Sequence, residues 1–106
     1  MKTINTLVDE SLTTRWALIA AMSPKNGHTI YFPDGLPHCP FCLEVQDAHG
    51  NLDCLRCRID HTICNYKHWG GGLYGHFLLA AQENDWRLFK LYTNKIIEKL
   101  KAMKTP

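Results

Sequence analysis

Residues 39–57 read CPFCLEVQDAHGNLDCLRC, in which two CxxC pairs are separated by eleven residues. Each pair places two thiols within reach of one metal ion, and the short intervening stretch can fold both pairs onto the same centre. Four thiolates complete a closed tetrahedral shell, which is the usual form of a structural zinc site. The sequence therefore predicts a structural Zn²⁺ held by Cys39, Cys42, Cys54 and Cys57.

A fifth cysteine leaves the ligand set open. Cys64 follows Cys57 by seven positions and is an alternative ligand in place of Cys54 or Cys57. His38 and His61 stand close to the cysteines in sequence and are further substitute ligands. An iron–sulfur cluster would also accept four cysteines, but the hairpin-like spacing favours zinc. A thioredoxin-type redox pair is disfavoured because no βαβ pattern accompanies the motif.

The length of the chain, 106 residues, predicts a single domain over residues 1–106. With 45% hydrophobic residues the core is modest, and small cores often depend on a metal or a disulfide. In zinc-binding peptides the metal contributes about 10–16 kcal/mol of folding free energy. We therefore expect the metal to stabilise the fold.

The first 22 residues carry an apolar stripe with steps of three and four, which predicts an amphipathic helix of about 18 residues. The stripe consists of Ile4, Leu7, Val8, Leu12, Trp16, Ile19 and Met22. Thr3 or Asn5 is expected to cap this helix, and Ser23-Pro24 to end it.

Two segments are predicted to be extended. Residues 28–32, HTIYF, have the composition of a short strand. Residues 47–51, DAHGN, are turn-forming, so residues 43–52 are expected to form a β-hairpin with one CxxC at each base. The predicted zinc hairpin spans residues 38–64.

Helical spacing returns in the last third of the chain. Apolar residues on the expected faces are Tyr74, Phe77, Leu78 and Ala81, followed by Trp86, Phe89, Ile96, Leu100 and Met103. Asn84 or Asp85 can cap the last helix. The predicted fold class is α+β and mainly helical: a small zinc-ribbon-like β-hairpin flanked by an N-terminal helix and one or two C-terminal helices.

Charge is concentrated near the end of the chain. The net charge is only +2, yet from residue 86 onward six basic side chains stand against one acidic side chain. They are Arg87, Lys90, Lys95, Lys99, Lys101 and Lys104. Such lysines solvate the outer face of a terminal helix and complement its dipole, or they contact nucleic acid or an acidic partner.

No stretch of the sequence approaches the roughly 18 consecutive apolar residues of a membrane span. Asp9 and Glu10 interrupt the segment where a signal peptide would need its apolar run. CxxC pairs without an export signal point to a reducing compartment. We expect a cytoplasmic protein that does not enter membranes.

Asp60-His61-Thr62-Ile63 follows a CxxC pair in the manner of the Asp-His-Ile core of HNH nucleases. A metal-dependent nuclease of that kind would need Asp60 and His61 to converge with His76 or His68.

The glycine-rich stretch at residues 70–75, Gly70-Gly71-Gly72-Leu73-Tyr74-Gly75, lacks the Lys-Ser/Thr of a P-loop and has no clear strand before it. The sequence therefore predicts no small-molecule substrate.

The order CPFC, CLRC, a fifth cysteine, an aromatic-containing helix and a lysine-rich helix resembles small cysteine-rich, zinc-ribbon-like proteins of phage and prophage-bearing bacterial genomes. The resemblance covers residues 38–100 and rests on the five cysteines. The two CxxC pairs alone are also similar to zinc ribbons and rubredoxin-like knuckles. A shared fold of this kind transfers no activity.

These patterns together favour a small, non-catalytic zinc-binding module that recognises another macromolecule. A protein adaptor would expose an apolar patch around Tyr31, Phe32, Phe41 or Trp69. A nucleic-acid binder would instead gather Arg56, Arg58, Lys67 and the C-terminal lysines on one face and bind with strong salt dependence. The metal-dependent HNH-like nuclease is the alternative.

Overall fold

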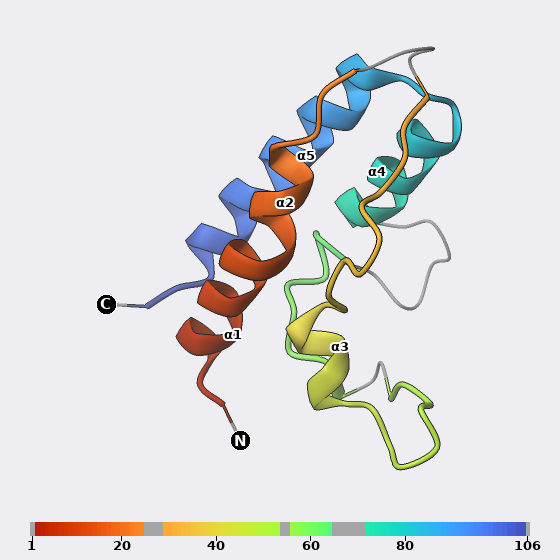
Figure 1. Ribbon diagram of the computed structural model, residues 1–106. Coiled ribbons are helices and arrows are strands. Elements are labelled where there is room, and N and C mark those ends of the chain that lie inside the picture. The colour runs from red at the N-terminus through yellow and green to blue at the C-terminus, as the bar shows by residue number, and fades with distance from the viewer. Residues whose placement is uncertain (1, 25–28, 54–55, 65–71, 106) are drawn as a thin grey trace.

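The computed structural model describes residues 2–24, 29–53, 56–64 and 72–105, and these residues are arranged as helices joined by irregular chain (Figure 1). The helices are α1 (Ile4–Glu10), the π-helix η1 (Ser11–Trp16), α2 (Ala17–Ala20), α3 (Pro40–Glu44), α4 (Gly72–Gln82) and α5 (Trp86–Ala102). The described ranges contain no β-strand. The α+β prediction was therefore wrong, and only its mainly helical part is confirmed.

The predicted N-terminal helix is confirmed as the continuous run α1–η1–α2. The Thr3 hydroxyl accepts a hydrogen bond of 3.1 Å from the Thr6 N–H and caps the first turn. The predicted apolar stripe faces the core, where Leu7, Val8, Trp16 and Ile19 are buried. The π-helical turns of η1 within this run were not predicted, because a single wider turn barely changes the apolar spacing.

Helices α4 and α5 form an antiparallel pair around stacked aromatic rings. The rings of Phe77 and Phe89 lie 5.0 Å apart at the centre of this packing. The Asp85 carboxylate accepts a hydrogen bond of 3.1 Å from the Leu88 N–H, as expected for the cap of the last helix. On α4, Phe77 and Ala80 are buried, whereas Leu78, predicted to face inward, is 39% exposed.

The N-terminal helical run lies alongside α5 in the opposite direction (Figure 1). Asn5, in the first turn of α1, links the start of this run to Thr105, which follows α5. Its amide donates a hydrogen bond of 2.7 Å to the Thr105 carbonyl and accepts one of 2.9 Å from the Thr105 N–H.

The segment predicted to be a β-hairpin contains a helix instead. Pro40 occupies the first position of α3, where its fixed φ favours a helical turn and its missing N–H is not needed. The turn at residues 47–51 is confirmed, since the Asp47 carboxylate accepts hydrogen bonds of 2.9 Å from the His49 and Asn51 N–H groups. Beyond this turn the pairing is one isolated antiparallel bridge between Gln46 and Leu52.

The predicted strand at residues 28–32 is also absent from its described part. His28 lies outside the described residues, and residues 29–32 are irregular. Ile30 is buried, and its N–H donates a hydrogen bond of 2.8 Å to the Asn84 side chain. This segment therefore bonds to the α4–α5 turn rather than to a neighbouring strand.

None of the helices in the described ranges is long and apolar enough to cross a membrane.

Candidate metal centre

Helix α3 positions the first CxxC pair. Phe41 is 1% exposed and anchors the helix in the core. The Leu43 N–H donates a hydrogen bond of 3.0 Å to the Cys39 carbonyl, which sets the first helical turn. Within this turn the side chains of Cys39 and Cys42 are hydrogen-bonded to each other. The predicted closeness of these two thiols is present.

A turn at residues 60–64 positions Cys64. The Asp60 carbonyl accepts hydrogen bonds of 2.9 Å from the Ile63 N–H and 3.2 Å from the Cys64 N–H. The Asp60 carboxylate accepts two more, 2.8 Å from the Thr62 N–H and 2.7 Å from its hydroxyl. Ile63 is 1% exposed and packs this turn into the core. The backbone that leads into Cys64 is therefore held by this turn and by the core.

The same turn meets the start of α4. The Leu73 N–H donates a hydrogen bond of 2.8 Å to the Thr62 carbonyl, and the Tyr74 N–H donates one of 2.8 Å to the Ile63 carbonyl. These two N–H groups belong to the first turn of α4, which has no partners for them within the helix. The cysteine segment thus completes the N-terminus of α4.

A cavity of about 290 Å³ lies between α3, the N-terminal helical run and the start of α4. Four cysteines line it: Cys39, Cys42, Cys57 and Cys64. Its remaining wall is largely apolar, with Trp16, Phe41 and Ile63 among the lining side chains. A much smaller cavity beside it is lined again by Cys42, Cys57 and Cys64, together with His61.

Three of the four predicted ligands, Cys39, Cys42 and Cys57, therefore lie around one cavity. Cys54 is outside the described residues. Cys64, the alternative ligand, lines the cavity, as does His38. In residues 2–24, 29–53, 56–64 and 72–105, no three His, Cys, Asp or Glu side chains are grouped closely enough to hold a metal ion. The thiols surround the cavity without being gathered at its centre.

The pKa values of the two thiols of the first pair are shifted in opposite directions. The hydrogen bond from Cys42, supported by the Cys42 and Phe41 N–H groups and by the Arg15 charge, lowers the pKa of Cys39 to about 6 against the opposing effect of burial. The same side-chain hydrogen bond raises the pKa of Cys42, and burial and the charges of the other cysteines raise it further. The first proton that the pair loses therefore comes from Cys39, and Cys42 donates its hydrogen bond to the resulting thiolate.

Arg15 connects two segments of the cavity wall by hydrogen bonds, a role that the sequence did not indicate. Its guanidinium donates a hydrogen bond of 2.8 Å to the Pro37 carbonyl and one of 3.0 Å to the Tyr74 hydroxyl. These contacts join η1 to the chain before α3 and to α4. A contact between residues 59 positions apart leaves no local pattern by which it could be found.

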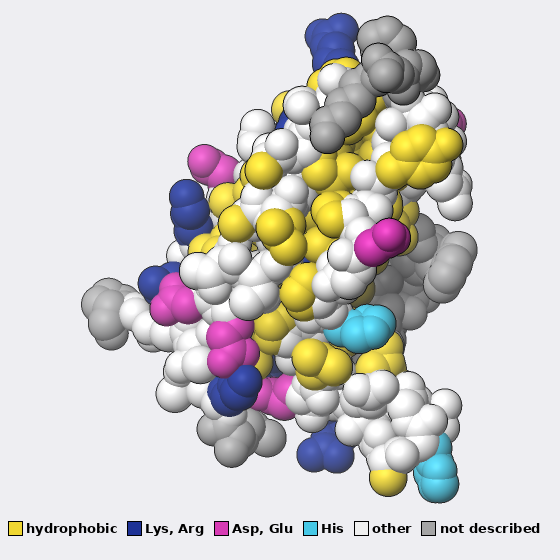
Figure 2. Space-filling view, viewed as in Figure 1, with side chains coloured by type: hydrophobic (Ala, Val, Ile, Leu, Met, Phe, Trp, Pro, Cys, Tyr) yellow, Lys and Arg dark blue, Asp and Glu magenta, His cyan; other side chains and the backbone are white. Residues whose placement is uncertain are grey.

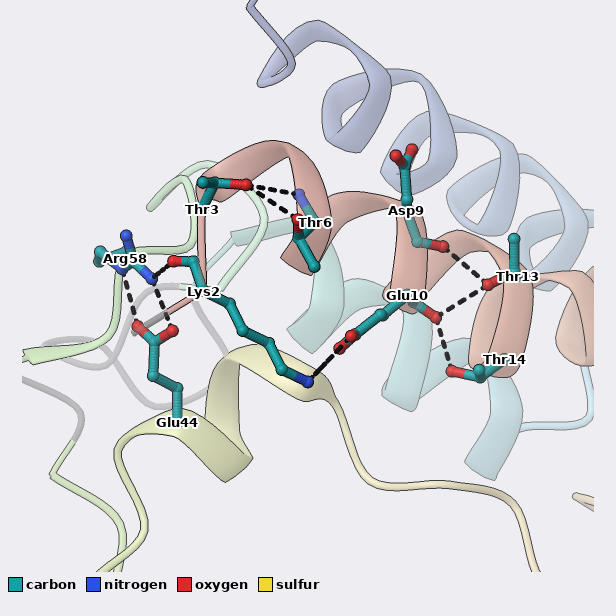
Figure 3. A network of polar contacts seen from close by, with 9 residues as sticks. All are labelled: Lys2, Thr3, Thr6, Asp9, Glu10, Thr13, Thr14, Glu44 and Arg58. Carbon is teal, nitrogen blue, oxygen red and sulfur yellow. Dashed lines mark hydrogen bonds and ion pairs between the residues drawn. The ribbon is translucent and has the colours of Figure 1, made fainter.

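An ion pair joins the chain after Cys57 to α3 (Figure 3). The Arg58 Nε donates a hydrogen bond of 2.7 Å to the Glu44 carboxylate, and its Nη2 donates one of 2.6 Å to the Lys2 carbonyl. The hydrogen bonds and charge of Arg58 lower the pKa of the Glu44 carboxyl. Arg58, counted above among candidate phosphate contacts, is thus engaged within the chain.

The residues of the nuclease alternative have other partners. The Asp60 carboxylate caps its own turn through Thr62, and these hydrogen bonds lower its pKa. The His76 ring stacks on Tyr92 with centroids 5.2 Å apart. His68 lies outside the described residues. No group of three candidate metal ligands including Asp60, His61 or His76 occurs in the described part of the chain.

The aromatic residues proposed for an adaptor patch separate into two groups. Tyr31 is 78% exposed, and Phe32 is 36% exposed while its ring also packs on Phe77. Phe41 is 1% exposed, so its placement on the surface was wrong. Trp69 is outside the described residues.

Comparison with protein-family models, with curated proteins and with solved structures finds no match to this chain. The resemblance to zinc-ribbon-like phage proteins is therefore still a prediction.

Proposed function

We propose that this chain is a small non-catalytic protein whose cysteine thiolates hold a structural Zn²⁺. Cys39, Cys42 and Cys57 supply three ligands, and either Cys54 or Cys64 supplies the fourth. The observation that carries the proposal is the convergence of cysteines from three separate segments on the wall of one cavity.

The donor set fits zinc. Four soft sulfur ligands in a tetrahedral arrangement are selective for zinc or for iron–sulfur centres. Zinc binds four thiolates in closed structural sites. The Cys39–Cys42 hydrogen bond already places two sulfurs side by side. Binding would require the thiols of Cys57 and the fourth cysteine to move inward from the cavity wall.

A structural role follows from the position of the site. The cavity lies between α3 and the turn that completes α4, two elements joined by little regular backbone pairing in the described ranges. A metal held from both sides would stabilise their packing. Binding free energies of about 10–16 kcal/mol for structural zinc in peptides equal the stability of an entire small domain.

We further propose that the module binds a protein rather than a nucleic acid. Of the predicted phosphate contacts, Arg58 pairs with Glu44 and Lys104 pairs with Asp9 at 2.7 Å. Lys67 lies outside the described residues. Hydrophobic side chains gather over the middle of one face, while charged side chains lie mainly along its α1 edge (Figure 2).

The proposed location is the cytoplasm. A reducing cytoplasm would keep the thiols available to metal.

Native mass spectrometry of protein purified without added metal tests the zinc proposal. We expect one zinc ion per chain in wild type and none in Cys39→Ser or Cys42→Ser. His49→Ala is the matched control, because His49 is an exposed side chain of a ligand-type residue that does not line the cavity. Wild-type protein without metal, or metal kept by Cys42→Ser, would contradict the proposal.

Fluorescence anisotropy with short DNA and RNA, single- and double-stranded, tests the choice of partner. Phosphate contacts would give an affinity that falls steeply with added salt. We expect no such binding at moderate salt. Salt-dependent binding that is lost in Arg56→Ala would favour the nucleic-acid binder instead.

A further inference from the structure

The sequence leaves the fourth ligand undecided between Cys54 and Cys64, and Cys64 is the one of the two whose surroundings the structure describes. Cys64 lines both adjoining cavities, and in both it shares the wall with Cys42 and Cys57.

The backbone of Cys64 is fixed by contacts outside the cysteine cluster. The Cys64 N–H donates a hydrogen bond of 3.2 Å to the Asp60 carbonyl, and the neighbouring Ile63 is 1% exposed in the core. A ligand held by a rigid backbone loses little conformational freedom on metal binding, which favours its use in the shell.

The position of Cys64 also connects the cavity to α4. The carbonyls of Thr62 and Ile63, just before Cys64, accept hydrogen bonds of 2.8 Å from the first N–H groups of α4. Gly72 permits this close approach, because a Cβ at its position would lie 2.8 Å from the Ile63 oxygen. Any restraint on Cys64 therefore acts on the helix start through two carbonyls.

We propose that Cys64 is the fourth metal ligand, completing a shell of Cys39, Cys42, Cys57 and Cys64, and that the bound metal thereby fastens the turn at residues 60–64 across from α3 and holds the first turn of α4 in place. This inference rests on the zinc proposal above. It assigns Cys54 no place in the shell.

Metal stoichiometry measured by native mass spectrometry tests the ligand assignment on wild type, Cys54→Ser, Cys64→Ser and Cys64→His. We expect one zinc ion in wild type and Cys54→Ser, and none in Cys64→Ser, as for the other ligand substitutions. Cys64→His should recover most of the binding, because an imidazole also ligates zinc. That recovery distinguishes a lost ligand from a misfolded chain.

The outcomes separate the two proposals. Wild type without zinc would overturn the zinc proposal itself. Zinc bound by wild type and by Cys64→Ser, but lost from Cys54→Ser, would leave the zinc proposal intact and overturn the assignment of Cys64.

Amide hydrogen exchange tests the coupling to α4. After removal of zinc by a chelator we expect the Leu73 and Tyr74 amides to exchange at least about tenfold faster, since local opening controls such exchange. The Leu88 amide is the matched control, because Asp85 caps it at the start of another helix. Unchanged exchange at Leu73 and Tyr74, or an equal rise at Leu88, would overturn the coupling.

Discussion

The ammonium group of Lys90 on α5 donates a hydrogen bond of 2.9 Å to the main-chain carbonyl of Ala20, the last residue of α2. It donates another to the carbonyl of Met22. Carbonyls at the end of a helix have no partner within it, and a cation there also complements the helix dipole. Lys90 therefore caps the N-terminal helical run from a neighbouring helix.

We expect Lys90→Met to lower the free energy of unfolding by about 1–2 kcal/mol, the range for a charged hydrogen bond at a helix C-terminus. Chemical denaturation monitored by circular dichroism measures this change. Lys101→Met is the control, since Lys101 is exposed on the same helix and such surface changes usually stay within about 0.5 kcal/mol. Equal effects of the two substitutions would contradict a capping role.

Gly72 begins α4 with φ +78°, a conformation that side chains rarely adopt, and it lies against the Ile63 carbonyl. Gly72→Ala should therefore add left-handed backbone strain of about 1–2 kcal/mol and an overpacking cost of about 1–3 kcal/mol. Gly35→Ala is the matched control, because Gly35 has φ +75° but nothing within 4 Å of the added Cβ. We expect Gly35→Ala to show the strain alone.

Thermal unfolding of the two glycine variants measures the difference. Similar melting temperatures for Gly72→Ala and Gly35→Ala would show that the close approach of α4 to the turn at residues 60–64 contributes nothing to stability.

The helices of this protein were predictable because their signals are local. The stripe from Ile4 to Met22 and the face from Trp86 to Met103 repeat at helical spacing, and Thr3 and Asp85 stand where caps belong. In each case the buried face and the cap lie within the segment itself, so tertiary packing only confirms what the sequence favours.

The β predictions failed because strands need partners that composition cannot supply. The segment at residues 29–32 has strand-like residues, yet its Ile30 N–H bonds to Asn84, 54 positions away, rather than to a neighbouring strand. At residues 43–52 the turn formed as predicted, but Pro40 and buried Phe41 favoured helix on one side of it.

The candidate site was predictable in part. The CxxC spacing identified Cys39, Cys42 and Cys57, which line one cavity. Cys64 was predicted only as an alternative ligand, and its place on the wall of the same cavity depends on the folding of distant segments against one another. The same holds for the hydrogen bonds of Arg15 across the cavity. The sequence also assigned Lys90 and Lys104 to solvent or a partner, whereas both bind within the chain.

The Arg58–Glu44 pair predicts how stability depends on acidity. Arg58 lowers the pKa of the Glu44 carboxyl below its ordinary value of 4.5. A carboxyl with a lowered pKa in the folded state contributes stability that is present above its unfolded pKa and lost as the pH falls through the folded value. We therefore expect the free energy of unfolding to decrease below pH 4.5 through this pair.

Denaturation experiments between pH 7 and about pH 3, the range in which this linkage acts, measure the free energy of unfolding. This free energy should depend less steeply on pH in Glu44→Gln than in wild type. Any loss of thiolate-held metal on acidification would be common to both proteins, so their difference isolates the carboxylate. Glu98→Gln, at an exposed position of α5, should behave as wild type. Parallel curves for wild type and Glu44→Gln would show that the Arg58–Glu44 pair does not contribute to the free energy of unfolding.

Ser11 at the start of η1 has a fully buried hydroxyl that has no hydrogen-bond partner. A buried polar group without a partner costs about 1–3 kcal/mol, and an apolar replacement of similar shape removes that cost. We expect Ser11→Ala to raise the free energy of unfolding by about 1 kcal/mol, helped by the better helix propensity of alanine. Thermal denaturation measures the gain.

Thr13→Ala separates burial from helix propensity. Thr13 is exposed on the same helix, and its hydroxyl donates a hydrogen bond of 2.8 Å to the Asp9 carbonyl. Its replacement improves propensity by about 0.5 kcal/mol without removing a buried polar group. A gain in Ser11→Ala no larger than that in Thr13→Ala would mean that the buried hydroxyl carries no penalty. A loss of stability in Ser11→Ala would show that this hydroxyl is bonded in solution, which would place a partner for it between η1 and the helices that cover it.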